Sequence, residues 1–266
     1  MYLQFWNLKD KPFENTPDPK FFYHTREHEE GLSRLLYVVR EGKGAGLLTG
    51  TYGCGKTLLS RALARELESD LYKVAYVTNP RLSDAEMLKS VLHSLGGGPI
   101  PQGKGEILIA LEKIVTANAR DGKKTVIVVD EAHAIEDPLI FEELRLLLNF
   151  QTEDKFLLTL LILGQDELKP KVAQIKQLDQ RIALRFHLQA LGAEETASYV
   201  HHRLLIAGAK SEIFDEGALS MVYRRSGGIP RRINQICDMA LLTGMSHQSP
   251  NIIEATVEEA VESLEN

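Results

Sequence analysis

One glycine-rich stretch carries residue types suited to binding phosphate. Residues 50–57 read GTYGCGKT and fit the pattern G-x-x-x-x-G-K-[ST]. Glycines let the backbone form a loop whose N–H groups face inward, and the following helix points the positive end of its dipole at the same place. We expect Lys56 to reach the β- and γ-phosphates of ATP, and the Thr57 hydroxyl to bind Mg²⁺. The expected nucleotide ligands here are Gly50, Thr51, Tyr52, Gly53, Cys54, Gly55, Lys56, Thr57 and Leu58.

A pair of carboxylates follows another apolar segment. Residues 125–130, TVIVVD, read as a buried strand that ends in Asp130, and Glu131 follows directly. A phosphate loop needs such a carboxylate at the end of a neighbouring strand, where it holds Mg²⁺ largely through water. Glu131 is then expected to orient or deprotonate the attacking water. Taken alone, an Asp-Glu pair could equally begin a solvated loop. The presence of the phosphate loop in the same sequence favours the catalytic interpretation.

The letters DEAH at residues 130–133 also occur in one group of RNA helicases. Those enzymes work between two similar nucleotide-binding lobes, whereas this sequence has material for one lobe followed by a small helical region. The pattern therefore predicts an ATPase carboxylate motif that ends in Ala-His. We expect His133 to pack or hydrogen-bond locally.

The elements that must position these residues alternate between strands and helices. Apolar segments predict strands at residues 46–50, 73–78, 125–130, 156–164 and 185–189. Helical spacing predicts helices between them at residues 56–67, 83–95, around 107–115 and 138–150, the second capped by Ser83. Continuous apolar strands separated by helices indicate a parallel sheet covered on both faces. After Gly192 only helical patterns remain, at residues 194–207, 215–226, 230–245 and 252–264.

These patterns predict an α/β fold in three parts. Residues 1–30, rich in proline and aromatic residues, form an extended N-terminal arm. Residues 31–190 form a P-loop NTPase core with a five-stranded parallel sheet between helices, and residues 191–266 form a small all-helical lid. One parallel-sheet core followed by a helical lid is the plan of the AAA+ ATPases.

Two polar positions fit further roles in that plan. Gln165 follows the strand at 156–164, where its amide can align the attacking water beside the γ-phosphate; a merely solvated glutamine is the alternative. Arg231 lies one residue into a helix that begins at Pro230, after the pair Gly227-Gly228. From that position it can reach the γ-phosphate, with Pro230 beside the nucleotide.

A third feature is an arginine that acts on the nucleotide of a neighbouring subunit. Arg181 and Arg185 lie just before and within the last strand. Such an arginine neutralises charge in the transition state and is worth about 10³–10⁵ in rate. We favour Arg181 and keep Arg185 in reserve, and each could instead be an ordinary surface arginine.

Composition limits the partners. The chain has 31 Lys and Arg against 37 Asp and Glu, so nucleic acid is not favoured, although the arginines at 224, 225, 231 and 232 form a local basic cluster. No apolar run approaches the roughly 20 residues that span a bilayer, and no signal peptide begins the sequence. Both cysteines lie outside metal or redox motifs. A cytoplasmic protein is therefore expected.

Seven motifs in order resemble the general secretion pathway protein A family of AAA+ ATPases, with relatives in pilus-biogenesis and exosortase-associated (PEP-CTERM) loci. They are FWNLKDKPFENTPDPKFFY, the phosphate loop, VIVVDEAHAIED, EELRLLLNF, LILGQDEL, LDQRIALRFHL and SGGIPRRIN. The resemblance implies a Mg²⁺-dependent ATPase that supports assembly or operation of a secretion or envelope machine, as a homo-oligomeric ring or filament. It also implies that the arm packs near the adenine, with Phe13 and Tyr23 lining it.

Other consequences of the resemblance are open. Members of the family often continue into a membrane span and a peptidoglycan-binding domain. The sequence ends after the lid, so we expect a short cytoplasmic form, recruited to the inner face of the inner membrane by a partner. Two alternatives remain: a DNA-handling ATPase of the transposition-regulator type, and an ATP-gated scaffold with little turnover.

Overall fold

The computed structural model describes residues 1–16, 19–21, 23, 25–67 and 70–265. The chain forms two compact units. One comprises residues 1–26, 51–58 and 189–266, and the other residues 27–50 and 59–188. We call them the helical unit and the sheet unit and describe each by itself.

The sheet unit is built on five strands in the order β2-β3-β4-β1-β5. They are β1 (Ala45–Gly50), β2 (Tyr72–Val77), β3 (Lys124–Val129), β4 (Leu158–Gly164) and β5 (Ile182–Leu188). Every pair of neighbouring strands is parallel, so all five end at the same edge of the sheet. The register pairs Thr49 with Gly164 and Val129 with Ile162, with β4 between β1 and β3. The predicted five-stranded parallel sheet is confirmed.

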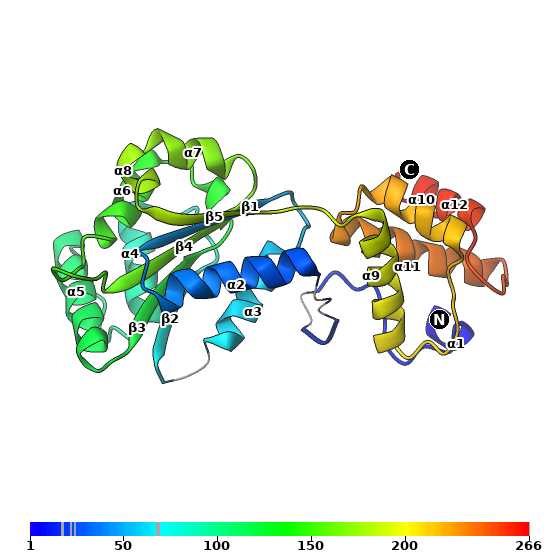
Figure 1. Cartoon of the computed structure of the whole chain (residues 1–266), viewed down its shortest axis with the longest axis horizontal. Helices are drawn as coiled ribbons and strands as arrows, with labels where there is room; N and C mark the ends of the chain where they lie inside the picture. The colour runs from blue at the N-terminus through cyan, green and yellow to red at the C-terminus, as the bar shows by residue number, and fades with distance from the viewer. Residues whose placement is uncertain (17–18, 22, 24, 68–69, 266) are drawn as a thin grey trace. The chain divides into compact units, whose positions relative to one another are not determined.

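Helices alternate with the strands along the chain (Figure 1). They are α2 (Arg26–Arg40), α3 (Lys56–Glu66), α4 (Asp84–Ser94), α5 (Lys104–Arg120), α6 (Pro138–Leu147), α7 (Leu168–Gln174) and α8 (Lys176–Asp179). The predicted cap of α4 is confirmed, because Ser83 and Glu86 form a reciprocal capping box. The short 3₁₀ turn η2 (Ala132–Ala134) follows β3.

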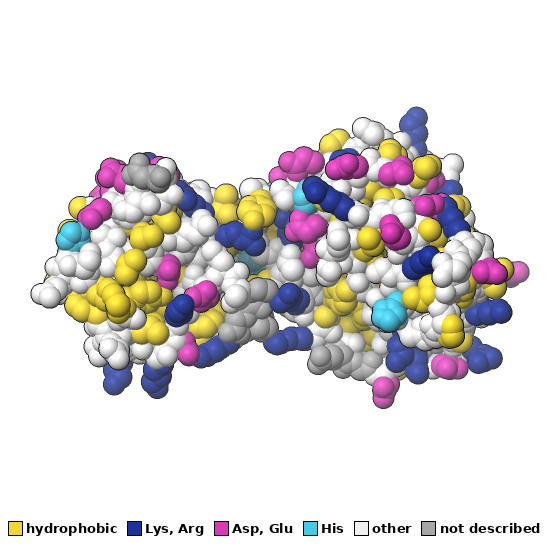
Figure 2. Space-filling model, turned by 180° about the vertical axis from the view of Figure 1, so that it is seen from behind, with side chains coloured by type: hydrophobic (Ala, Val, Ile, Leu, Met, Phe, Trp, Pro, Cys, Tyr) yellow, Lys and Arg dark blue, Asp and Glu magenta, His cyan; other side chains and the backbone are white. Residues whose placement is uncertain are grey.

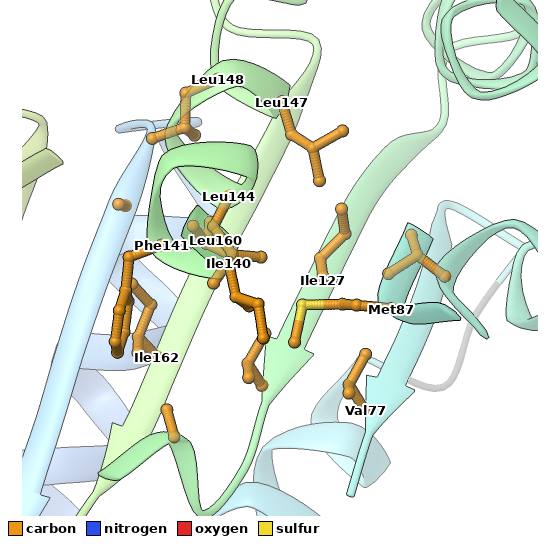
Figure 3. Packing of buried hydrophobic residues seen from close by; sticks show 14 of the residues in the cluster. Val77, Met87, Ile127, Ile140, Phe141, Leu144, Leu147, Leu148, Leu160 and Ile162 are labelled. Carbon is orange, nitrogen blue, oxygen red and sulfur yellow. The ribbon is translucent and has the colours of Figure 1, made fainter. Parts of the chain in front are cut away.

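One face of the sheet packs against α4 to α8 in a single buried cluster. Figure 3 shows Met87 of α4 reaching toward Val77 and Ile127, while Phe141 of α6 lies beside Ile162. Each is at most 2% exposed, and full burial of such a side chain contributes about 1.5–3 kcal/mol.

The other face of the sheet is also dry, which accounts for the continuous apolar runs in the strands. Leu48, Val128 and Leu161 are 0% exposed. Helix α2 approaches β5 closely, because a Cβ at Gly31 would lie 2.8 Å from the ring of Phe186. The sequence did not predict α2, whose first turn falls in the segment expected to be an extended arm.

The helical unit contains α1 (Tyr2–Phe5), the 3₁₀ turn η1 (Pro19–Phe21), α9 (Ala193–Ile206), α10 (Glu216–Ser226), α11 (Pro230–Ser246) and α12 (Glu254–Glu265). The last four confirm the predicted helices to within two residues. Segments from both ends of the sequence share one core, in which Trp6 and Phe13 pack among residues of α9 to α12. The indole nitrogen of Trp6 donates a hydrogen bond of 2.9 Å to the carbonyl of Leu241.

The junction between α10 and α11 requires glycine. Gly227 and Gly228 have φ values of 60° and 73°, in the left-handed region that glycine populates readily. A Cβ at Gly228 would lie 1.9 Å from the carbonyl oxygen of Leu191. Pro230 then occupies the first position of α11. Across the described part of the chain, no helix is long and apolar enough to cross a membrane.

Candidate nucleotide site

The glycine-rich loop connects β1 to α3, in the arrangement that its sequence predicts. Gly50 ends β1, and a Cβ there would lie 2.6 Å from the carbonyl oxygen of Leu188 on the adjacent strand. Gly53 and Gly55 have φ values of 85° and 99°, which turn the backbone toward the start of α3. Lys56 is 5% exposed, and its Nζ donates to the carbonyl oxygen of Thr51 at 3.0 Å. The ammonium is thus held within the loop, where bound phosphates would meet it.

Side chains of α11 contact this loop inside the helical unit. The guanidinium of Arg231 stacks on the Tyr52 ring, with 4.5 Å from its Cζ to the ring centroid, and donates a hydrogen bond to the Tyr52 hydroxyl. The backbone N–H of Arg231 donates to the carbonyl of Gly53 at 3.4 Å. A Cβ at Gly53 would lie 2.9 Å from Cβ of Arg231 and 3.0 Å from Ile229, so this glycine permits the close approach. The structure brings Arg231 and Pro230 to the loop, while Tyr52 as a partner of Arg231 was not predicted.

The two carboxylates lie at the end of β3, at the edge of the sheet where β1 also ends. Asp130 is 4% exposed, and its Oδ1 accepts from the Glu131 N–H at 2.9 Å. Glu131 has φ 54° and ψ 30°, a conformation that is uncommon outside glycine and that stores strain of about 1–3 kcal/mol. Burial, and then the charge of Asp130, raise the pKa of Tyr76 to about 12. This hydroxyl stays neutral and donates to the Ser60 carbonyl at 3.0 Å.

His133 contacts both Glu131 and Gln165. Its Nε2 lies 3.4 Å from Oε2 of Glu131 and 2.9 Å from the side-chain amide of Gln165. The Gln165 backbone N–H donates to Nδ1 at 3.3 Å. The expectation that His133 hydrogen-bonds locally is confirmed. Gln165 is half-buried and bonded to a ring, a partner that the sequence spacing did not reveal.

The two candidate arginine fingers are bonded within the sheet unit. Nη1 of Arg181 donates to the carbonyl oxygen of Arg145, at the end of α6, at 3.2 Å. Arg185 pairs with Asp179 at 2.7 Å, and about half of its side chain is exposed. The structure gives both arginines a local role, and action on a neighbouring subunit stays a prediction.

The two aromatic residues expected at the adenine lie in the helical unit. Phe13 is 2% exposed and meets Phe214 edge to face at 6.3 Å. Tyr23 packs against the rings of Tyr199 and His202, at 6.0 and 5.2 Å. Phe13 therefore belongs to the apolar core of this unit, and the partly buried Tyr23 packs against that core.

A buried polar network fixes the arm to the helical unit and was not predicted. Arg203, 5% exposed, donates to the Tyr199 hydroxyl at 2.7 Å and to the Glu14 carbonyl at 3.1 Å. Tyr199 donates to Asn234, which in turn donates to Asn15 at 3.0 Å. Arg203 and Tyr199 are four residues apart on α9. The links to Glu14, Asn15 and Asn234 span 35 residues or more, so no local spacing signals the network.

A divalent cation would depend on few protein ligands. The described residues include no group of three or more His, Cys, Asp and Glu side chains placed to hold a metal ion. Mg²⁺ bound with a nucleotide keeps several waters and needs only one or two protein ligands besides the phosphates. Thr57, at the second position of α3, and the buried Asp130 supply that oxygen chemistry.

Two carboxylates of helix α12 pair with three of the four arginines of the basic cluster. Arg224 pairs with Glu254, and Arg225 and Arg232 pair with Glu265, at 3.7 and 2.8 Å for the latter two. Figure 2 shows acidic and basic side chains interspersed on the face that it presents. These pairs weaken the case for a phosphate-backbone contact at this cluster.

A phosphate loop after one strand of a parallel sheet and a carboxylate pair after another define a P-loop NTPase. The chain belongs to the AAA domain family, whose sequence pattern matches residues 39–172, about half of the chain. It is also similar to general secretion pathway protein A of Aeromonas hydrophila, with 38% identity over 263 residues. The match covers 97% of this chain and 47% of that protein, so the chain spans about half the length of this curated relative.

Solved structures show the same fold at low sequence identity. Drosophila ORC bound to DNA has a TM-score of 0.75 at 20% identity, over 100% of this chain and 66% of that one. Aeropyrum pernix ORC2, solved in ADPNP–ADP complexes, has a TM-score of 0.69 at 20% sequence identity, and the match covers 96% of this chain and 72% of that one. The Thermotoga maritima RuvB Holliday junction branch migration motor has a TM-score of 0.62 at 18% sequence identity, and the match covers 96% of this chain and 74% of that one. The AAA fold and the predicted family resemblance are thus confirmed.

Proposed function

We propose that the chain binds ATP with Mg²⁺ and hydrolyses it, in support of the assembly or operation of a secretion or envelope protein machine. The observation that carries the proposal is the position of Asp130 and Glu131 directly after β3, at the edge of the parallel sheet where β1 ends and the glycine-rich segment follows in the chain. The similarity to general secretion pathway protein A supports the cellular role.

Each residue has a separate task in this mechanism. The loop N–H groups and Lys56 bind the phosphates, and Thr57 and Asp130 would hold Mg²⁺, which would supply neutralisation of the phosphate charge. Glu131 takes the proton of the attacking water. As the water oxygen bonds to the γ-phosphorus, the bond from phosphorus to the bridging oxygen breaks, and ADP and phosphate result.

The remaining roles complete the proposal. Gln165 aligns the water, and Arg231 moves from Tyr52 onto the γ-phosphate. Arg181, or Arg185 in its place, acts on the nucleotide of a neighbouring subunit in a homo-oligomer. Work on an envelope machine would place the protein in the cytoplasm, recruited to the inner face of the inner membrane by a partner.

Two substitutions test the proposed reaction. Lys56→Ala should lose ATP binding, because the ammonium that meets the phosphates is removed. Glu131→Gln should bind ATP with near-normal affinity and hydrolyse it at least about 100-fold more slowly, because the amide cannot accept the proton. Filter binding with labelled ATP and steady-state phosphate release measure the two effects. Normal turnover by Glu131→Gln would contradict the mechanism, and a rate that rises only with DNA would favour the DNA-handling alternative.

A further inference from the structure

His133 occupies the space between the two side chains proposed to act on the attacking water. Its Nε2 is 3.4 Å from the Glu131 carboxylate and 2.9 Å from the Gln165 amide. All three residues belong to the sheet unit. The imidazole is therefore within hydrogen-bonding distance of the Gln165 amide and lies beside the Glu131 carboxylate.

The protonation of the ring follows from its surroundings. A neutral imidazole has one acceptor nitrogen and one donor nitrogen. Nδ1 is the acceptor, because the backbone N–H of Gln165 points at it from 3.3 Å. Nε2 consequently carries the proton and donates. The Gln165 amide can accept from it only through its oxygen, an orientation that rotation of the amide by 180° provides.

The ring is also fixed in place. His133 lies in the tight turn η2, and its carbonyl oxygen accepts from Nζ of Lys171 at 2.5 Å. The same ammonium donates to the Ile135 carbonyl at 2.7 Å. A Cβ at Gly164 would lie 3.0 Å from the His133 nitrogen, so the backbones of η2 and β4 are in close contact. Only 18% of the His133 side chain is exposed, against 41% for Glu131.

We propose that His133 is a positioning residue for ATP hydrolysis. Its Nε2–H donates to the Gln165 oxygen, and the same ring lies 3.4 Å from the Glu131 carboxylate, so that the base and the water-aligning amide keep a fixed separation. Without this link, the half-exposed Glu131 side chain, on a strained backbone, samples other rotamers. The inference rests on the proposed ATPase function and assigns a role to the histidine that distinguishes this motif from a bare Asp-Glu pair.

The test compares His133→Ala with His133→Gln, whose terminal amide N–H can take the place of Nε2–H. We expect kcat to fall about ten- to a hundredfold in His133→Ala, because the hydrogen bond to Gln165 and the contact with the charged Glu131 are both lost, with KM for ATP unchanged. His133→Gln should recover most of that loss. His93→Ala, at an exposed histidine of α4 in the same unit, is the matched control and should retain wild-type kcat.

A double-mutant cycle separates positioning from general damage. If His133 and Gln165 act as a unit, Gln165→Leu should lower kcat in the wild type and add less than about twofold in His133→Ala. Fully additive losses, a changed KM with unchanged kcat, or no recovery in His133→Gln would overturn the inference.

Two outcomes separate a failure of the proposed His133 role from a failure of the proposed ATPase function. A wild-type rate equal to that of Lys56→Ala would refute the ATPase function and, with it, the inference. Normal kcat in His133→Ala, with Glu131→Gln inactive, would refute only the inference. Should His133→Ala fail to fold, ¹⁵N NMR of wild-type imidazole nitrogens decides: protonation at Nδ1 instead of Nε2 would overturn it.

Discussion

The contact between Tyr52 and Arg231 predicts that removing the tyrosine ring strengthens ATP binding. Arg231 is proposed to contact the γ-phosphate, yet in the structure its guanidinium stacks on Tyr52 at 4.5 Å and donates to the hydroxyl. To reach a phosphate it must give up both interactions. Tyr52→Ala removes both interactions and should favour the arrangement in which Arg231 contacts the phosphate.

The magnitude follows from the exposure of the pair. Tyr52 is 55% exposed, so the cation–π contact is worth about 0.5–1 kcal/mol and the hydrogen bond about 0.5–1 kcal/mol. Together they give about 1–2 kcal/mol, or an about 5- to 30-fold lower Kd for ATP. Tyr52→Phe, which keeps the ring, should show roughly half of the effect in kcal/mol.

Isothermal titration calorimetry with ATP and ADP provides the assay and its control. ADP lacks the γ-phosphate, so its Kd should be unchanged in Tyr52→Ala. In an Arg231→Ala background the tyrosine substitution should no longer affect ATP binding. Weaker binding of both nucleotides, in both backgrounds, would refute the reasoning and show that the tyrosine itself contacts the nucleotide.

Two further predictions concern stability and assembly. Lys104→Met should lower the free energy of unfolding by about 1–3 kcal/mol, measured in urea, since Glu143, with a 10% exposed side chain, loses its 2.7 Å ion pair. The hydrogen bond from Lys104 lowers the pKa of Asp84. The contribution of this carboxylate to stability is therefore present above its unfolded pKa of about 3.9 and is lost as the pH falls through the lower folded value. If the difference in unfolding free energy between wild type and Lys104→Met does not shrink below pH 4, this prediction is wrong. Arg181→Ala should abolish any rise of ATPase rate per subunit with protein concentration, and a rise that persists would exclude Arg181 as the finger.

Local sequence patterns predicted most of the sheet and of the phosphate loop. The glycine spacing of the loop and the apolar run before Asp130 depend on contacts within a few residues or on burial of a whole strand. The same holds for the cap at Ser83, which needs only Glu86 three residues later. Boundaries of the strands and helices were correct to within a few residues.

Long-range contacts account for what the sequence did not reveal. The stacking of Tyr52 on Arg231 joins residues 179 positions apart, and the bond between His133 and Gln165 spans 32 positions. Helix α2 was missed because its first turn adjoins a segment rich in proline and aromatic residues. In the structure Phe13 and Phe21 lie in the core shared with α9 to α12, a location that composition alone does not specify.

The shared core of the helical unit has a consequence for synthesis of the chain. Trp6 bonds to Leu241, 235 residues later, so the arm leaves the ribosome long before its partners exist. At about 5–20 residues per second the interval is on the order of 10–50 s. Residues 59–188 emerge meanwhile and can fold with residues 27–50, whereas Trp6 and Phe13 stay exposed until α9 to α12 have been made. During synthesis the N-terminal segment is therefore an exposed apolar segment that a chaperone can bind. Packing against α9 to α12 then buries it and ends that exposure.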